Sequence, residues 1–133
     1  MTRVGATSFL TQAARAELAS IEERSEAAIA AGTVTRAEAE HDREAWAALA
    51  DLFGTGETRT DLTLADLEEA AARALARRER ALDRCTDDAK RPNLRARRDL
   101  VEAIHRRISH RRWSVEDLNK RLRARAQRED LAA

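Results

Sequence analysis

The chain has 133 residues, a formal net charge of +1 and 43% hydrophobic residues. Four glycines, one proline, no tyrosine and no run that alternates apolar and polar residues exclude a mainly β protein and favour helices. No segment approaches the ~20 apolar residues of a membrane span, and the first residues lack the apolar stretch of a signal peptide. Without such segments we expect no membrane partner. Cys85 is the one cysteine and cannot form an internal disulfide, so we expect a reducing, cytoplasmic location.

Alanine dominates the apolar residues, since it supplies 29 of them, about half of the hydrophobic total. Alanine is the best helix former but buries little area, which suits long helices with a thin core between them. We therefore expect one all-α domain over residues 1–133, a bundle of four to five helices with long Ala-rich helices and short connections.

The near-neutral total charge hides an asymmetry along the chain. Residues 1–90 carry a net charge of −6 and residues 91–133 a net charge of +7. We expect acidic helices over residues 8–86 and basic C-terminal helices over residues 93–128. Either the acidic part pairs with the basic helices, or the basic helices present a positive face on an acidic scaffold. Exposed charges act over only ~8 Å at physiological salt, so only clustered arginines would matter to a partner.

The first predicted helix covers about residues 9–31. Thr7 or Ser8 can cap its start, and Gly32 supplies a left-handed stop. Its apolar residues fall on one face at helical spacing. This face consists of Leu10, Ala14, Leu18, Ile21, Ala28 and Ile29.

The second predicted helix begins with the clearest local pattern in the chain. Thr35 and Glu38 have the spacing of a capping box, and Val34 precedes them as a hydrophobic staple. Gly54 is expected to end this helix, and the composition of residues 54–61 indicates a loop. This loop either separates two helical hairpins or, as we expect, crosses within one bundle, because either half alone would bury too little. The inward face is formed by Ala45, Leu49, Leu52 and Phe53, with Trp46 at its edge.

A third helix is predicted over about residues 64–86, with Asp61 or Thr63 as cap. Its inward face is Leu64, Leu67, Ala71, Leu75 and Leu82. Pro92 interrupts the helical pattern, and a fourth helix follows over about residues 94–109. Its inward residues are Leu100, Val101, Ile104 and Ile108.

A short break is predicted over residues 109–114, after which Ser114 caps a fifth helix. Its inward residues are Val115, Leu118, Leu122 and Ala126, and the last residues are expected to fray. The segment "RRWSVEDLNKRL" resembles the turn and second helix of a helix-turn-helix, over about a dozen residues. It departs from that motif because no further recognition helix follows, so the resemblance assigns no family.

Two Glu-x-x-His stretches, at residues 38–41 and 102–105, have the spacing that di-metal carboxylate bundles use. Residues i and i+3 share a helix face, so both side chains can reach one metal pair. The remaining ligands would be Glu17 or Glu22 and Glu68.

Three observations weigh against a metal centre. Glu38 already has a capping role, His41 and His105 lie at different levels of their helices, and Glu102 projects away from the apolar face. A di-metal bundle therefore stays a remote alternative, and we expect no metal and no cofactor. No Gly-rich phosphate loop and no nucleophile motif is present, so we expect no enzyme activity and no catalytic residues.

The basic C-terminal third is the most suggestive segment for function. Guanidinium groups suit phosphates because their planar forks bond two oxygens at once, and an aromatic side chain among them can stack on a base or fill a partner's pocket. The candidate nucleic-acid or partner-binding residues are Arg106, Arg107, Arg111, Arg112, Trp113, Lys120, Arg121 and Arg125. The structural alternative is that Trp113 packs at the end of the bundle and the arginines form a solvated face.

These observations predict a non-catalytic, macromolecule-binding helical protein, an adaptor, accessory or inhibitor, that uses a charged helix face with Trp113 or Trp46 as anchor. Its composition, rich in alanine, arginine and glutamate, is typical of small helical proteins encoded by phages and mobile elements. The alternative is a nucleic-acid-binding regulator acting through the Arg-rich C-terminal helices. Another protein is the expected partner, nucleic acid is the alternative, and a homodimer stays open because a thin core leaves apolar faces that a second copy could cover.

Overall fold

The computed structural model describes residues 6–132, and their side chains from residue 9 onward. Within this range the chain is all-helical with four helices and no strand, which confirms the expected fold class. The helices are α1 (Ala6–Ala30), α2 (Arg36–Thr55), α3 (Leu64–Arg84) and α4 (Arg91–Ala132). No helix in this part of the chain combines the length and the apolar character that crossing a lipid bilayer requires.

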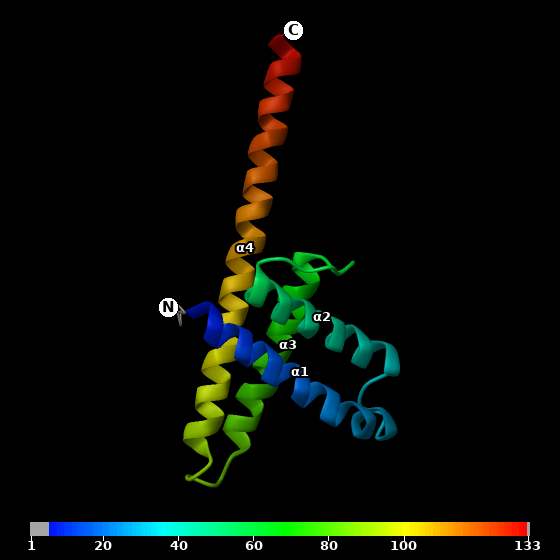
Figure 1. The fold of residues 1–133 in the computed structure, drawn as a ribbon, viewed down its shortest axis with the longest axis vertical. Helices are drawn as coiled ribbons and strands as arrows, with labels where there is room; N and C mark the ends of the chain where they lie inside the picture. The colour runs from blue at the N-terminus through cyan, green and yellow to red at the C-terminus, as the bar shows by residue number, and fades with distance from the viewer. Residues whose placement is uncertain (1–5, 133) are drawn as a thin grey trace.

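The four helices form two antiparallel hairpins that cross each other (Figure 1). α1 pairs with α2, α3 pairs with α4, and each hairpin contacts the other mainly through α2 with α3 and α1 with α4. α4 has 42 residues, which is ~63 Å at 1.5 Å per residue. Figure 1 shows that the second half of α4 extends well beyond the other three helices.

Capping residues set the starts of α2 and α3. Thr35 Oγ1 accepts from the Glu38 amide at 3.1 Å and the Thr35 amide donates to Glu38 Oε1 at 3.4 Å, so the predicted capping box is confirmed. Thr63, one of the two predicted caps of α3, forms a second box with Asp66. Each box satisfies two amides that the first helical turn leaves free.

The C-terminal ends of the first two helices depend on glycine. Gly32 has φ of +74° and follows α1, as predicted, because this backbone conformation is strained for any side chain. α2 ends later than expected: it continues through Gly54, and Gly56, with φ of +83°, provides the left-handed cap. At the other end, α1 begins at Ala6, so Thr7 and Ser8 lie inside the helix and do not cap it.

The core lies where the two hairpins cross. Its largest fully buried side chains are Trp46, Leu49, Leu67, Ile104 and Ile108. Fully buried alanines line the same seam, and their small side chains let helix axes approach closely. Trp46 is wholly buried and not at the edge of its face, because α2 lies inside the crossing and is covered on more than one side. It therefore cannot anchor a partner.

Several predictions about α4 are wrong. The break over residues 109–114 is absent, and Arg91–Ala132 is one continuous helix. Pro92 lies in its first turn, where a missing amide costs nothing, so the helix begins earlier than expected. Leu100, expected to face inward, is 39% exposed, while its neighbour Val101 is buried. The buried face of α4 is thus Val101, Ile104 and Ile108.

Candidate functional site

None of residues 113–132 is buried, and Figure 1 shows that this end of α4 extends past the other helices, so we call these residues the α4 arm. At 1.5 Å per residue the arm is ~30 Å long. Neither glycine nor proline interrupts the helix at its base. Charged pairs one helical turn apart support it: Arg112–Glu116 at 2.7 Å, Arg121–Asp117 at 3.0 Å and Arg125–Glu129 at 3.1 Å. These local contacts explain why the helix continues where a break was expected.

The arm carries an apolar stripe that continues the buried seam of α4. Val101, Ile104 and Ile108 follow alternating spacings of three and four residues, and the same spacing continues through 111 to 115, 118 and 122. Positions 115, 118 and 122 are Val115, Leu118 and Leu122. They were expected to face inward, but they are 41%, 56% and 53% exposed, because no other helix of the described chain reaches them.

Arginine interrupts and borders this stripe. Arg111 occupies the position between Ile108 and Val115, and Arg125 follows Leu122 by three residues. Glu116 and Asp117 project from other faces of the helix, whereas Glu129, one heptad after Leu122, lies on the same face and pairs with Arg125. The stripe is therefore a band of leucine and valine with guanidinium groups in and beside it.

A cavity of about 400 Å³ lies at the base of the arm. Leu52 and Phe53 from the end of α2 and Ile108 from α4 give it an apolar floor, and Arg107 and Arg111 stand at its rim. Neither arginine has an ion-pair partner among the described residues. Ile108 and Arg111 line the cavity and lie on the same face of α4 as the stripe on the arm.

All eight candidate binding residues lie on α4, and only Arg112 among them forms an ion pair with the acidic half of the described chain. Of the ion pairs within the described range, one links α4 to the other helices, Arg112 to Glu68 at 2.8 Å. Arg106 pairs with Glu102 on its own helix. No ion pair is found for Arg107, Arg111 or Lys120 in this part of the chain. The arrangement is thus a positive face beside an acidic scaffold.

Arg112 fixes the base of the arm to α3. Its Nε and Nη2 atoms donate to the two carboxylate oxygens of Glu68 at 2.8 and 3.1 Å, and its Nη1 donates to Glu116. The hydrogen bond from Arg112 is the main cause that lowers the pKa of Glu68. The same contacts raise the pKa of Arg112, which stays charged throughout the accessible range. This fork holds the arm in one direction relative to the core.

The Glu68–Arg112 contact predicts a pH-dependent contribution to stability. Because folding lowers the pKa of Glu68 from its usual 4.5, the contribution is complete above that value and is lost as the pH falls through the lowered pKa. We expect Arg112→Gln to reduce the free energy of unfolding near neutral pH and to matter less at about pH 3. Urea unfolding at both pH values checks this, with the exposed Arg107→Gln as control. An Arg112→Gln effect that is equal at the two pH values would contradict it.

Trp113 is on the surface, with 62% of its area exposed. The alternative that it packs at the end of the bundle is therefore wrong. Its ring stacks with that of His110, with centroids 6.3 Å apart and planes inclined by 27°. At 100° per residue, Trp113 lies on the side of α4 opposite Leu122, together with Arg106 and Lys120. The arm thus has two distinct faces, one apolar with arginines and one aromatic with cations.

The carboxylates of the two Glu-x-x-His stretches have other partners. Glu38 belongs to the capping box, and Glu102 pairs with Arg98 and Arg106. Glu17, a proposed third ligand, bonds to Arg78. Within residues 9–132 no group of three or more His, Cys, Asp or Glu side chains is placed to hold a metal ion.

Sequence reasoning missed two features of this surface. The heptad-like spacing from Val101 to Leu122 was visible in the sequence and would have indicated one continuous helix across residues 109–114. The cavity at the base of the arm had no such sequence pattern, because α2 and α4 reach it from positions more than 50 residues apart.

Comparisons with known proteins add no assignment. No protein-family model, no curated protein and no solved structure matches this chain. The function must therefore be inferred from the side chains and their arrangement on α4.

Proposed function

We propose that this chain is a non-catalytic binding protein, an adaptor, accessory or inhibitor, that docks another protein on its α4 arm. The observation that carries the proposal is the exposed stripe of Val115, Leu118 and Leu122. Three large apolar side chains lie together on one face of this helix, and covering the exposed half of each would contribute roughly half of the ~1.5–3 kcal/mol that full burial gives. A stripe at this spacing is the surface that a second amphipathic helix covers.

Charge indicates the kind of helix that would bind. A partner lying along the stripe would face Arg111 and Arg125, and it would meet Arg107 at the cavity beneath. Acidic side chains beside apolar ones would pair with these guanidinium groups, and the pairs would also set the register of the two helices. We infer an acidic amphipathic helix as the partner.

A second copy of this chain fits the same surface less well. In a parallel homodimer each Arg111 would face Arg111 of the other copy, and each Arg125 its equivalent. Repulsion between these like charges disfavours the homodimer, and a helix of opposite charge would bind the same surface more tightly. We therefore favour a partner of opposite charge over a second copy of this chain.

The binding test uses a synthetic helical peptide of about four heptads with Leu at the a and d positions and Glu at e and g. We expect it to bind the full chain, and we expect a matched peptide with Lys at e and g not to bind. Leu118→Gln with Leu122→Gln should weaken binding by more than tenfold, because the two leucines together would bury more than the ~1.4 kcal/mol of a tenfold change. Calorimetry or fluorescence anisotropy gives the affinities.

The control for this experiment lies on the opposite face of the arm. Lys120→Gln should leave binding of the acidic peptide unchanged, whereas Arg111→Gln with Arg125→Gln should weaken it. Equal affinity for the acidic and basic peptides would remove the charge argument. If sedimentation shows a dimer that Leu118→Gln with Leu122→Gln dissociates, the stripe is covered by a second copy and the proposal is wrong.

A nucleic-acid-binding regulator is the second candidate, and one observation favours it. Exposed Trp113, stacked on His110, lies among cations and could stack on a base. This candidate predicts binding to duplex or single strands that weakens with salt, with a log–log slope near −0.9 per duplex phosphate contacted. It also predicts that Trp113→Ala weakens binding and that the two leucine substitutions do not. A slope near zero would exclude it.

A further inference from the structure

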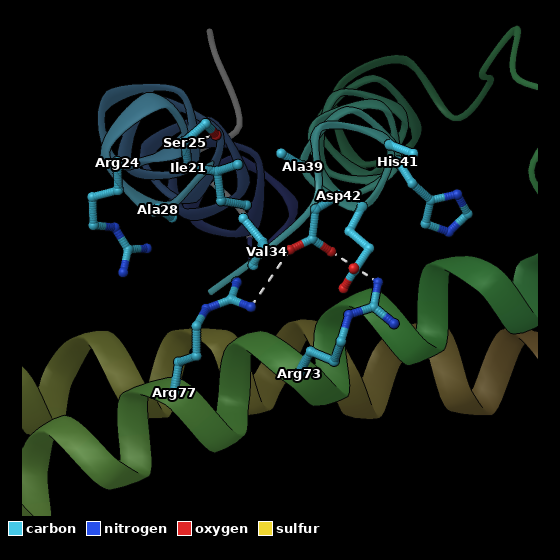
Figure 2. A pocket seen from close by; sticks show the side chains of 12 residues that line it. Ile21, Arg24, Ser25, Ala28, Val34, Ala39, His41, Asp42, Arg73 and Arg77 are labelled. Carbon is cyan, nitrogen blue, oxygen red and sulfur yellow. Dashed lines mark hydrogen bonds and ion pairs between the residues drawn. The ribbon is translucent and has the colours of Figure 1, made fainter. Parts of the chain in front are cut away.

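A second cavity, of about 520 Å³, opens between the loop end of the α1–α2 hairpin and α3. We call it the hairpin cleft. Figure 2 shows apolar side chains from three segments around it: Ile21 and Ala28 from α1, Val34 from the connection, and Ala39 from α2. Its volume lies in the range of ~300–1,000 Å³ that small-molecule sites occupy.

Three guanidinium groups border the hairpin cleft. Arg24 extends from α1 towards α3, and Arg73 and Arg77 extend from α3 towards the hairpin (Figure 2). Asp42 of α2 accepts from Arg73 at 2.8 Å and from Arg77 at 3.5 Å. Glu38 also lines the cleft, but its carboxylate already accepts from the Thr35 amide.

The cleft therefore has more cationic groups than carboxylates to pair with them. Arg77 Nη2 is buried and has no hydrogen-bond partner, and a buried donor without an acceptor is costly. Arg24 donates its Nε proton to the Ser20 carbonyl of its own helix at 3.2 Å, and no carboxylate pairs with it in the described chain. An anion bound between Arg24 and Arg77 would satisfy both.

The two arginines are close enough to act on each other. Burial is the main cause that lowers the pKa of Arg77, while the carboxylates of Asp42 and Glu17 raise it and repulsion from Arg24 and Arg73 lowers it further. A negative group placed between them would reverse this repulsion. Arg24 and Arg77 enter the cleft from opposite walls, so such a group would lie between α1 and α3.

We propose that the hairpin cleft binds a small amphipathic monocarboxylate, whose carboxylate bonds to Arg24 and Arg77 and whose hydrocarbon chain lies against the alanine and valine wall. Guanidinium forks match the two oxygens of a carboxylate, and the apolar lining excludes a ligand that is charged throughout. This site lies between the α1–α2 hairpin and α3 and shares no residue with the α4 arm, so it does not depend on the function proposed for the arm.

The test compares four ligands with the same eight-carbon chain: octanoate, octanol, octylammonium and octyl phosphate. Binding to the full chain is followed by amide shifts in two-dimensional NMR. We expect octanoate to shift the amides around Val34 and Ala39 and to bind at least tenfold more tightly than octanol, and octylammonium not to bind there. Octyl phosphate binding more tightly than octanoate would overturn the assignment of a carboxylate.

Two variants and a control separate charge from shape. Arg24→Gln should weaken octanoate binding about tenfold, the loss of one charge-assisted contact, and should leave octanol unchanged. Ala28→Phe should fill the apolar part and remove both ligands, with thermal unfolding confirming that the fold is kept. Arg43→Gln, an exposed arginine of α2 outside the cleft, should change nothing. Octanoate shifts at Leu118 or Leu122 instead, or full affinity in Arg24→Gln, would overturn the proposal.

Discussion

Replacing Glu17 by alanine should lower the free energy of unfolding by about 3–5 kcal/mol, the cost of breaking a buried ion pair by removing one partner. Glu17 Oε2 accepts from Arg78 Nη2 at 2.6 Å and from its Nε at 3.2 Å. The side chains of Glu17 and Arg78 are only 4% and 11% exposed. The substitution would leave a guanidinium group in the crossing of the two hairpins without its counter-charge.

The double variant Glu17→Leu with Arg78→Met distinguishes this explanation from a simple loss of packing. It should recover most or all of the stability, because well-packed apolar side chains often replace a buried ion pair without cost. The pair is also incompletely satisfied in this protein, since Glu17 Oε1 is buried without a hydrogen-bond partner. Urea unfolding of Glu17→Leu, of Arg78→Met and of the double variant completes the cycle. Additive losses in the double variant would show that the two side chains do not act as a pair.

This ion pair joins residues 61 positions apart in the chain, which is why no sequence pattern indicated it. The features that were predictable are local. The Thr35–Glu38 box, the Thr63 cap and the Gly32 stop each depend on residues within one or two turns, and the structure confirms all three. The hairpin cleft, by contrast, is formed by the crossing of α1 and α2 over α3, and that crossing is not encoded in any short segment.

The faulty prediction of a fifth helix has a different cause. Ser109 and Ser114 are frequent at helix caps, so they were interpreted as the edges of a break. Side-chain pairs one turn apart outweigh this weak preference, and the contact of Arg112 with Glu68 fixes the helix to the core at the same place. The cap preference of a serine was a less reliable guide than the heptad-like spacing that runs from Ile104 past Ser109 and Ser114 to Leu118.

Substitution by alanine should lower the free energy of unfolding strongly at Ile104 and very little at Leu118, although both residues belong to α4. They lie two heptads apart on nearly the same face. Ile104 is fully buried, so Ile104→Ala should cost about 2–5 kcal/mol through lost burial and the cavity left behind. Leu118 is 56% exposed on the arm, so Leu118→Ala should change stability by less than about 0.5 kcal/mol.

The contrast also tests the division of α4 into a structural half and a binding half. Chemical unfolding of both variants, with and without the acidic helical peptide, gives the free energies. With saturating peptide, the unmodified chain should gain stability by mass action and Leu118→Ala should gain less, because a bound partner stabilises only the form that binds it. A Leu118→Ala loss above about 2 kcal/mol without peptide would mean that the stripe is already covered in the isolated protein. The arm would then belong to the core or to a dimer, and its apolar stripe would not be the surface that docks another protein.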